Sequence, residues 1–488
     1  MIESQRIVGD TGWDPEKLAL EDPERFRQLL ESFHLLKGGA LGRLPHVAEL
    51  DAARYFAADC SEHLRYCTAA GGWHIWDGQR WTRDDNGAVV RLAEARVDRI
   101  IDSASSEPDL KERQRRLNLA MALRKRRGIE NVIALAACEN DIAVGKPTAF
   151  DADPWLLNAA NGTIDLRTGQ LRPHFSGDLL TKLVPIAFDT VARCDRWEAF
   201  LREIFAGNTA TIDYLQRAVG YSLTGANLEQ VFFVLHGSGA NGKTTFLATL
   251  VAITGEYGLN ARPETFVGRR DNAATNDLAR LRGARFVSSS EIAEGKPLDE
   301  AFVKAATGGD IISARFLYGE YFEFEPVFKL WLGTNHKPVI RGVDEGIWRR
   351  VRLIPFEQRF DGDRCDPDLR AKLDGELPGI LAWAVRGCLA WQERGLRAPE
   401  TVTKATAAYR TEMDAFGAFL DEQCVVDPKA VASAGDLLSA YRSWAEAAGE
   451  KPLTQRWLGL RLEDRGFRKK RNHAGRVVWC GIGLQNEP

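Results

Sequence analysis

One short segment restricts the fold of this chain more than any other. Residues 231–235 are all apolar, mostly β-branched or aromatic, and the pattern G-x4-G-K-T follows at 237–244. Such a run is typical of a strand that is buried on both faces of a parallel sheet. A glycine-rich turn between a strand and a helix lets backbone N–H groups close around phosphate oxygens. The segment therefore predicts an α/β domain that binds a nucleoside triphosphate.

The residues of this loop have separate predicted roles. Lys243 supplies a positive charge to the β- and γ-phosphates, and Thr244 supplies a hydroxyl group to Mg²⁺. ATP and Mg²⁺ are therefore the predicted cofactors. The residues predicted to bind the nucleotide are Gly237, Gly239, Ala240, Asn241, Gly242, Lys243, Thr244 and Thr245.

Two further strand-like runs end in polar residues that suit phosphate chemistry. Glu291 follows residues 284–290 and is placed to polarise the attacking water or to hold Mg²⁺; a surface glutamate at the start of a loop is the alternative. Asn335 follows residues 328–334 and is placed to sense the γ-phosphate; a turn-forming asparagine is the alternative. Because ligands of α/β sheets bind at the carboxyl ends of strands, these residues are predicted to share one site.

An arginine precedes the last strand-like run. Arg350 comes directly before residues 351–356, so it faces away from a nucleotide bound at the other end of that strand. We predict that Arg350 reaches the site of a neighbouring subunit and neutralises transition-state charge there; an ordinary interface or surface ion pair is the alternative. The predicted catalytic residues are thus Lys243, Glu291, Asn335 and Arg350, and the predicted metal ligands are Thr244 and Glu291.

The segment between the two polar-ended runs predicts a hairpin. Residues 304–324 indicate a helix end, a tight Gly-Gly-Asp turn and a β-hairpin with its tip near 318–320. In this order the motifs resemble those of superfamily 3 helicases, and specifically the phage and plasmid primase–helicase family related to the poxvirus nucleoside triphosphatase. The strong part of the resemblance covers about 205–360, and weaker similarity extends back to a Trp-rich segment at 71–81.

The resemblance implies both a fold and a mode of action. The fold is α/β: a P-loop AAA+ core, an α+β N-terminal region and a C-terminal winged-helix domain. The action is that of an ATP-dependent DNA helicase that forms hexameric rings and translocates on single-stranded or forked DNA, in the replication of a phage or mobile element. A separate primase or polymerase is an implied partner, and a bacterial host cytoplasm the implied location. The implied DNA contacts of the hairpin are Lys304, Arg315, Leu317 and Tyr318.

The sequence departs from this family in three respects. Ser290-Glu291 stands where many members have two acids, so a single carboxylate is left to serve both metal and water. The hairpin tip is also less basic than usual, which shifts the expected grip on DNA toward Arg315 and stacking by Tyr318. Finally, no convincing acidic primase motif precedes the nucleotide loop, so we expect no primer synthesis by this polypeptide.

The C-terminal end predicts a second DNA-contacting region. Helical patterns from 433 and from 454 are followed by a hairpin over 467–479, an order that suggests a winged helix. Six basic residues and no acid lie between 465 and 476, a composition that suits phosphate contacts; protein docking or a solvated wing is the alternative. The residues predicted to contact DNA are Arg468, Lys469, Lys470 and Arg471.

The N-terminal part contains two further patterns. Three tryptophans at 73, 76 and 81 are expected to fill a small sheet core, with base stacking as the alternative. A basic stretch at 111–127 is expected to be a solvated helix face, with phosphate contacts as the alternative.

Composition excludes other classes of function. The 488 residues carry a net charge of −3, which excludes a uniformly basic coat protein but allows local basic patches. No apolar run reaches the ~18 residues of a membrane span, so no membrane partner is expected. Three alternatives remain: an ATP-switched initiator or loader that does not unwind, a small-molecule P-loop kinase, and a motor that acts in defence or packaging, which the sequence does not separate from replication. The predicted divisions are an N-terminal region at 1–190, a helical collar at 191–228, the core at 229–362, a helical lid and linker at 363–428 and a winged helix at 429–488.

Overall fold

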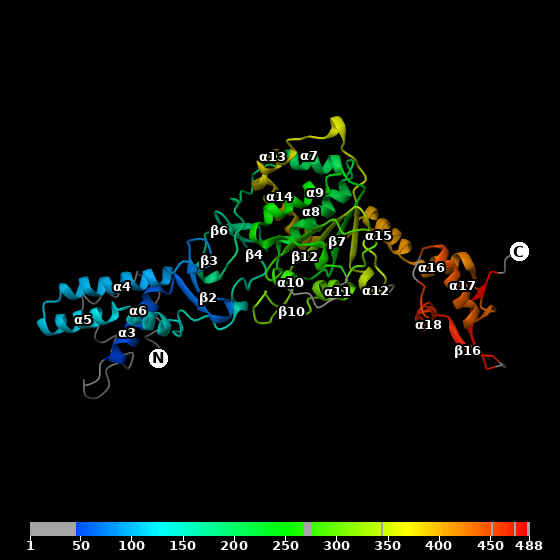
Figure 1. The fold of residues 1–488 in the computed structure, drawn as a ribbon. Coiled ribbons are helices and arrows are strands. Elements are labelled where there is room, and N and C mark those ends of the chain that lie inside the picture. Colours follow the sequence, from blue (N-terminus) through cyan, green and yellow to red (C-terminus); the bar gives the residue numbers. More distant parts are fainter. Residues whose placement is uncertain (1–44, 268–275, 343–344, 450–451, 473–474, 486–488) are drawn as a thin grey trace. The chain divides into compact units, whose positions relative to one another are not determined.

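The computed structural model describes residues 45–485, except 268–275, 343–344, 450–451 and 473–474 (Figure 1). The chain divides into two compact units, and the boundary lies between Phe188 and Asp189. Among the helices of the described part, none combines the length and the apolar character needed to cross a bilayer.

The first unit contains a group of helices and two antiparallel three-stranded sheets. Trp81 is fully buried, and its ring centre lies 5.7 Å from that of Trp76, so these two residues fill a core as expected. The helices are α3 (Pro45–Cys60), α4 (Ala88–Ser105), α5 (Leu110–Leu123) and α6 (Arg126–Ala136). The sheets are β1 (Leu64–Cys67), β2 (Gly72–Trp76) and β3 (Trp81–Arg83), and β4 (Leu156–Ala159), β5 (Gly162–Asp165) and β6 (Gln170–Arg172).

The basic stretch at 111–127 falls on α5 and α6, where acids of the same chain accompany it. Arg116 forms ion pairs with Glu107 and Glu112, at 3.2 and 3.1 Å. Arg126 pairs with Glu130 one turn further along α6, at 2.7 Å. These pairs fit a solvated helix face, because they leave less positive charge for a phosphate chain.

A parallel five-stranded sheet forms the centre of the second unit. Its strands are β7 (Phe232–His236), β8 (Gly258–Asn260), β9 (Phe286–Ser290), β12 (Lys329–Thr334) and β13 (Val351–Pro355). They lie side by side in the order β13-β7-β12-β9-β8, and all neighbouring pairs are parallel. The carboxyl ends of all five strands therefore meet at one edge. This mixed α/β arrangement is consistent with a nucleotide-binding core.

Helices cover both faces of this sheet (Figure 1). On one face the rings of Phe233 and Trp331 stack at 4.0 Å, and Trp331 also contacts Phe246 of α9. Trp197 and Trp383 extend the same aromatic cluster to α7 and α14, with ring centres 5.6 Å apart. The helices of this face are α7 (Asp195–Ile204), α8 (Thr209–Leu223), α9 (Lys243–Thr254) and α14 (Leu377–Arg394). The segment expected to be a lid thus supplies, through α14, part of the core.

The opposite face buries aliphatic side chains. Val234, Leu332 and Leu353 of three neighbouring strands join one cluster, which extends to Tyr409. The elements on this side and at its margins are α10 (Asn276–Ala279), α11 (Glu300–Gly308), α12 (Glu345–Trp348) and α15 (Glu400–Glu412), together with the hairpin β10 (Ile312–Ala314) and β11 (Phe322–Phe324). The short helix α13 (Leu369–Asp374) precedes α14.

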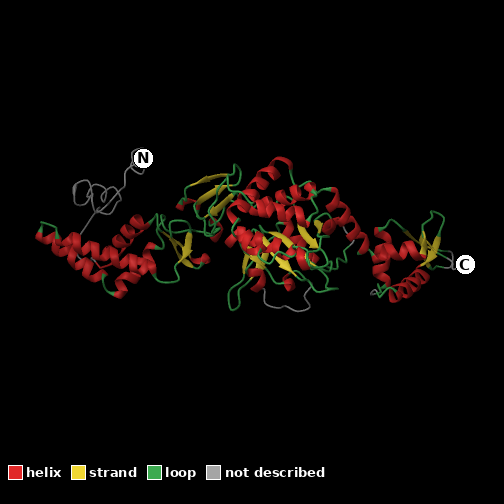
Figure 2. Ribbon diagram, turned by 90° about the horizontal axis from the view of Figure 1, so that it is seen from above, coloured by secondary structure: helices red, strands yellow, loops and turns green. Residues whose placement is uncertain are grey.

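The C-terminal residues of the second unit form a group of helices and short strands (Figure 2). This group has a hydrophobic core of its own. The elements are α16 (Ala415–Gln423), β14 (Cys424–Val425), β15 (Val431–Ser433), α17 (Ala434–Ala447), α18 (Gln455–Asp464), β16 (Arg468–Arg471), β17 (Val477–Cys480) and β18 (Gly483–Leu484). Two helices followed by a hairpin appear in the predicted order. Phe416 and Phe419 of α16 pack against Tyr441 in this core, which therefore begins before residue 429.

Candidate nucleotide site and DNA-contact surfaces

Close packing shapes the glycine-rich loop after β7. A Cβ atom at Gly237 would lie 2.2 Å from the carbonyl oxygen of Phe356, so only glycine fits there. Gly242 has a φ of 86°, and a Cβ atom at this position would meet a methyl group of Ile204 at 2.8 Å. Asn241 Nδ2 donates to the Phe356 carbonyl at 3.2 Å, which ties the loop to the end of β13. Local sequence and distant packing together therefore hold the loop in place.

Lys243 is a buried cation at the centre of this loop. Its side chain is only 7% exposed, and its Nζ donates to Gly237 O at 2.7 Å and to Asn241 Oδ1 and Asn335 Oδ1 at 3.0 Å. All three acceptors are neutral oxygens, and burial lowers the pKa of Lys243. Within the described part of the chain no carboxylate pairs with Lys243, and a buried cation in such surroundings is stabilised by an incoming anion. The arrangement therefore suits a phosphate group, which would add the missing negative charge.

The hydroxyl residues of the loop follow on the first turn of α9. Thr244 is exposed and Thr245 half-buried. Gly239 and Ala240 both have positive φ values, of 94° and 47°, so the loop turns in the left-handed region before the helix begins. The N-terminus of α9 thus presents backbone N–H groups and an accessible Thr244 hydroxyl, a combination that fits a phosphate-bound Mg²⁺.

Sheet register brings the polar strand ends together. Thr334 of β12 pairs with His236 of β7, and Gly333 pairs with Ser290 of β9. Asn335 therefore follows the middle strand of the three, between the glycine-rich loop and Glu291. Its contact with Lys243 joins positions 92 residues apart in the chain.

Glu291 directly follows β9 and has an unusual backbone. Its φ is 65°, in the left-handed region that few residues other than glycine adopt, and its N–H donates to Gly333 O at 2.9 Å. The side chain is exposed. Strained backbone at a strand end is common where a side chain must be held for function. An exposed carboxylate one strand beyond Asn335 could bind a metal ion or orient the attacking water.

The sequence analysis did not predict two features at this edge of the sheet, a histidine with a lowered pKa and an ion pair. Burial, then the nearby Lys337 and Lys243, lower the pKa of His236, which ends the apolar strand β7. Lys337, two residues after Asn335, forms an ion pair with Glu412 at the end of α15. His236 carries a weak sequence signal, as the first polar residue after the apolar run. The Lys337–Glu412 pair carries none, because its members lie 75 positions apart.

Arg350 lies at the opposite edge, where β13 begins. This position faces away from the glycine-rich loop of its own chain, as expected from the sequence. Its guanidinium group is nevertheless buried: the residue is 9% exposed, and it donates to Thr307 Oγ1 at 3.0 Å and to the carbonyl oxygen of Gly346. The adjacent Arg349 is exposed and donates to Gln230 Oε1 at 3.2 Å. Of the two arginines, Arg349 is the one that presents its side chain to solvent.

The hairpin residues are largely exposed. Tyr318 at the tip is 100% exposed and Leu317 is 61% exposed. The guanidinium carbon of Arg315 lies 4.8 Å from the ring centre of Tyr321. Lys304 is half-buried on α11, away from the tip in sequence.

The four predicted C-terminal residues form the whole of β16. Arg468, Lys469, Lys470 and Arg471 are all exposed. Among the described strands β16 lies at the edge of the sheet β15-β17-β16 and pairs with β17. An edge strand of four cations is a compact patch of positive charge. Such a patch suits a phosphate backbone, whose contacts do not depend on base sequence.

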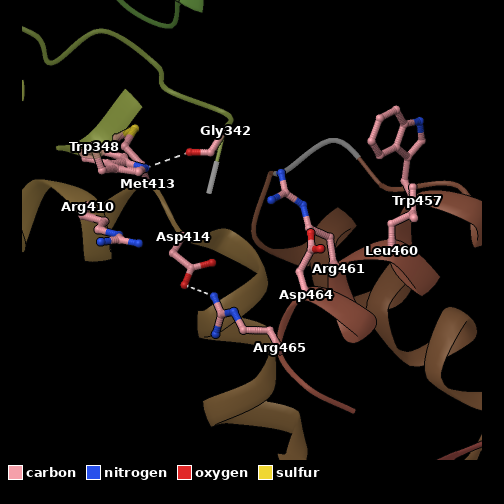
Figure 3. Close-up of a pocket in the computed structure, with 10 residues that line it drawn as sticks. All are labelled: Gly342, Trp348, Arg410, Met413, Asp414, Trp457, Leu460, Arg461, Asp464 and Arg465. Atoms are coloured by element: carbon pink, nitrogen blue, oxygen red, sulfur yellow. Dashed lines mark hydrogen bonds and ion pairs between the residues drawn. The ribbon is translucent and has the colours of Figure 1, made fainter. Parts of the chain in front are cut away.

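A cavity of about 750 Å³ lies elsewhere in the second unit. Trp348, Arg410 and Asp414 line one side of it, and residues of α18, including Arg461 and Trp457, line another (Figure 3). Arg465 forms an ion pair with Asp414 within it. None of the predicted nucleotide residues lines this cavity.

Comparisons with known proteins agree on one class of relative. Residues 53–206 match the family described as "D5 N terminal like". The chain is 26% identical over 466 residues to a "Putative helicase" of Acanthamoeba polyphaga mimivirus, covering 87% of this chain and 48% of that protein. It is 31% identical over 270 residues to a "Putative helicase" of Frog virus 3, covering 51% of this chain and 28% of that protein. These matches support a relation to a primase–helicase family.

Other comparisons give weaker likeness. A "Putative primase" of African swine fever virus is 22% identical over 331 residues, covering 61% of this chain and 34% of that protein. The chain thus spans about half, or less, of the length of these curated relatives. The solved apo structure of the NrS-1 C terminal region overlaps 89% of this chain and 100% of that one, at 9% identity and a TM-score of 0.47.

Proposed function

We propose that this chain is an ATP- and Mg²⁺-dependent DNA helicase motor of the AAA+ superfamily 3 type, which forms rings and translocates on single-stranded DNA during replication of a phage or mobile element. The observation that carries the proposal is the Lys243–Asn335 hydrogen bond, at 3.0 Å. It joins a phosphate-binding loop to the neighbouring strand end, where a water-positioning group is needed. The viral relatives named as helicases and a primase support a role in replication.

The residues present fit ATP and Mg²⁺. Lys243 offers a charge whose three hydrogen-bond acceptors among the described residues are neutral, and the N-terminus of α9 offers backbone donors. The Thr244 hydroxyl and the Glu291 carboxylate would hold Mg²⁺, which neutralises phosphate charge when bound. Asn335 would exchange its bond with Lys243 for one with the γ-phosphate or the attacking water. Glu291 would orient that water and accept its proton.

Ring formation is proposed because a motor of this type needs charge neutralisation from a second copy. Arg350 remains the proposed donor in trans, at the strand edge opposite its own nucleotide loop. To reach a neighbour, its guanidinium would have to exchange the bonds to Thr307 and Gly346 for new ones. The exposed Arg349 serves as the natural comparison for that role.

The C-terminal elements are proposed to act as a winged helix that holds DNA near the motor. The exposed cations of β16 would contact phosphates, without reading base sequence. The hairpin residues Lys304, Arg315, Leu317 and Tyr318 would contact the translocated strand. That the chain makes no primers of its own stays a prediction, tested by incubating it with template and ribonucleotides.

Strand displacement tests the proposal directly. A forked duplex with one labelled strand is mixed with the protein and ATP, and release of the labelled strand is followed in a gel. We expect release with the wild-type chain and none with Lys243→Ala, since loss of one preorganised charge costs about 10²–10³ in rate. Lys337→Ala is the matched control, because it removes a nearby cation outside the loop. DNA-stimulated hydrolysis without strand release would instead assign the chain to the initiator or loader class.

A further inference from the structure

The hairpin at residues 310–325, called here the aromatic hairpin, has an unusual surface. The exposed residues of this short segment include five large apolar side chains, namely Ile311, Phe316, Leu317, Tyr318 and Tyr321. Large apolar side chains gathered on a projecting turn are costly in water and indicate a contact surface.

The charge of the aromatic hairpin is the opposite of what a phosphate chain requires. Its sequence contains four acids, Asp310, Glu320, Glu323 and Glu325, and one base, Arg315, a net charge of −3. All four acids are exposed. Carboxylates repel a polyanion, and phosphate-reading surfaces are positively charged. The four carboxylates therefore disfavour contact with phosphates and leave the exposed rings as the groups suited to a ligand.

The side chain of Arg315 contacts another residue of the same hairpin. Its guanidinium carbon lies 4.8 Å from the ring centre of Tyr321, a cation–π contact. Beside it, Phe316 and Phe322 stack with ring centres 5.7 Å apart. The hairpin therefore offers planar groups, stacked or free to stack, in place of a row of free cations.

The tip is held in a defined turn. Gly319 N–H donates to Phe316 O at 2.9 Å, and Leu317 N–H donates to Asn276 Oδ1 of α10 at 3.2 Å. Tyr318 adopts a left-handed φ of 63° at the tip. A fixed backbone with a fully exposed ring is a platform on which a planar partner can stack at small entropic cost.

We propose that the aromatic hairpin grips single-stranded DNA through its bases, by stacking on Tyr318 and its aromatic neighbours, rather than through its phosphates. Every base offers an aromatic face, so stacking tolerates any sequence. In duplex DNA these faces are covered by neighbouring bases, so the hairpin selects unpaired strands. The inference rests on the proposed function, and it adds which part of the strand this motor holds.

An abasic oligonucleotide separates stacking from phosphate contact. The full chain is titrated with fluorescent oligothymidylate and with an abasic strand of the same length, in the presence of a non-hydrolysable ATP analogue, and the two affinities are compared by anisotropy. Because phosphate contacts are common to both strands, they largely cancel in the ratio. Stacking of one base is worth about fivefold or more in affinity, so we expect the wild-type ratio to reach at least that value.

Two variants of one residue then assign the effect. Tyr318→Ala is expected to bring the ratio close to one, and Tyr318→Phe to keep it, because phenylalanine retains the ring. Equal thermal midpoints of all three proteins would show that the comparison concerns contact and not folding. A wild-type ratio near one, a ratio unchanged in Tyr318→Ala, or its loss in Tyr318→Phe would each overturn the inference.

Failure of the proposed function would look different. If the wild-type chain bound no single strand and its hydrolysis did not respond to DNA, both proposals would fall together. If it bound both strands equally well, only the stacking inference would fall. Loss of self-association in Tyr318→Ala, with the affinity ratio unchanged, would instead assign the aromatic hairpin to contact with another copy and overturn the inference.

Discussion

The aromatic hairpin and strand β16 are both proposed to contact DNA, yet they have contrasting surfaces. The hairpin carries four acids and one base around exposed rings, whereas β16 consists of four exposed cations. The first suits base faces, and the second suits phosphates. Under these two proposals the chain divides its contacts with DNA between a salt-sensitive phosphate contact on β16 and a base-stacking contact on the hairpin.

The largest predicted effect is on ATP hydrolysis between subunits of the proposed ring. Hairpins of neighbouring copies can act on one DNA strand only within such a ring. Arg350→Ala is expected to lower the rate of ATP hydrolysis about 10³-fold while nucleotide binding persists, because an arginine supplied in trans is worth that much or more. Steady-state hydrolysis and binding of a fluorescent nucleotide measure the two properties.

Arg349→Ala is the matched control for this change. Arg349 is exposed and Arg350 is buried. Comparing the two substitutions therefore separates a catalytic role in a neighbouring subunit, read from turnover, from a structural role within the same subunit, read from the thermal midpoint. If Arg350→Ala lowered only the thermal midpoint and kept its turnover, the residue would be structural. Loss of turnover in Arg349→Ala alone would move the trans role to that position.

The next effect tests the contrast itself. Replacing all four cations of β16 by alanine should weaken binding of any single strand and reduce its salt dependence, by a slope of about 0.7 for each phosphate that the variant no longer neutralises. The preference for bases over abasic sites should remain, since it belongs to the hairpin. Affinities measured over a range of salt concentrations, for both kinds of strand, check this.

The reverse result would break the comparison. If the β16 variant lost its preference for bases, or if Tyr318→Ala flattened the salt dependence, the two surfaces would not divide the work as proposed. A variant in which only Arg126 and Arg127 of α6 become alanine controls for the general loss of positive charge.

The smallest predicted effect is a pH dependence of stability that arises from His236, beside the candidate nucleotide site. Burial, with Lys337 and Lys243 nearby and Glu412 opposing them, lowers the pKa of His236. Below a pH of about 6.5 the unfolded chain then takes up a proton that the folded chain does not, so stability is full above that pH and falls below it. Each pKa unit of difference is worth about 1.4 kcal/mol.

His236→Gln should lose this pH dependence. The thermal midpoints of the variant and the wild-type chain are compared at pH 7.5 and at pH 5.5. We expect the wild-type midpoint to fall more on acidification than that of the variant. Equal falls in both proteins would show that other groups dominate the response.

Much of the candidate nucleotide site could be predicted because its signals are local. The apolar strand, the glycines and the lysine that follows are contiguous, and their spacing reflects how a backbone turns around a phosphate. That Asn335 belongs to the same edge also followed from pattern, since parallel strands end together. In the structure Asn335 Oδ1 accepts a hydrogen bond from Lys243 at that edge, whereas its predicted role toward the γ-phosphate stays a prediction.

Other features were out of reach because they depend on distant partners. Arg350 and Arg349 are chemically alike in sequence, and only the packing of Thr307 and Gly346 against one of them separates buried from exposed. Likewise, nothing local indicates that α14 packs against α7 or that Phe416 belongs to the C-terminal core.

By itself, then, the sequence determined that a glycine-rich loop stands between a buried strand and a helix, and that cations gather near the C-terminus. These are properties of neighbouring residues, which backbone geometry and charge link directly. Only the tertiary structure decided the order of the strands, the neutral surroundings of Lys243 and the exposure of the hairpin rings. Those depend on which surfaces exclude water from one another, and burial is a property of the whole packed chain.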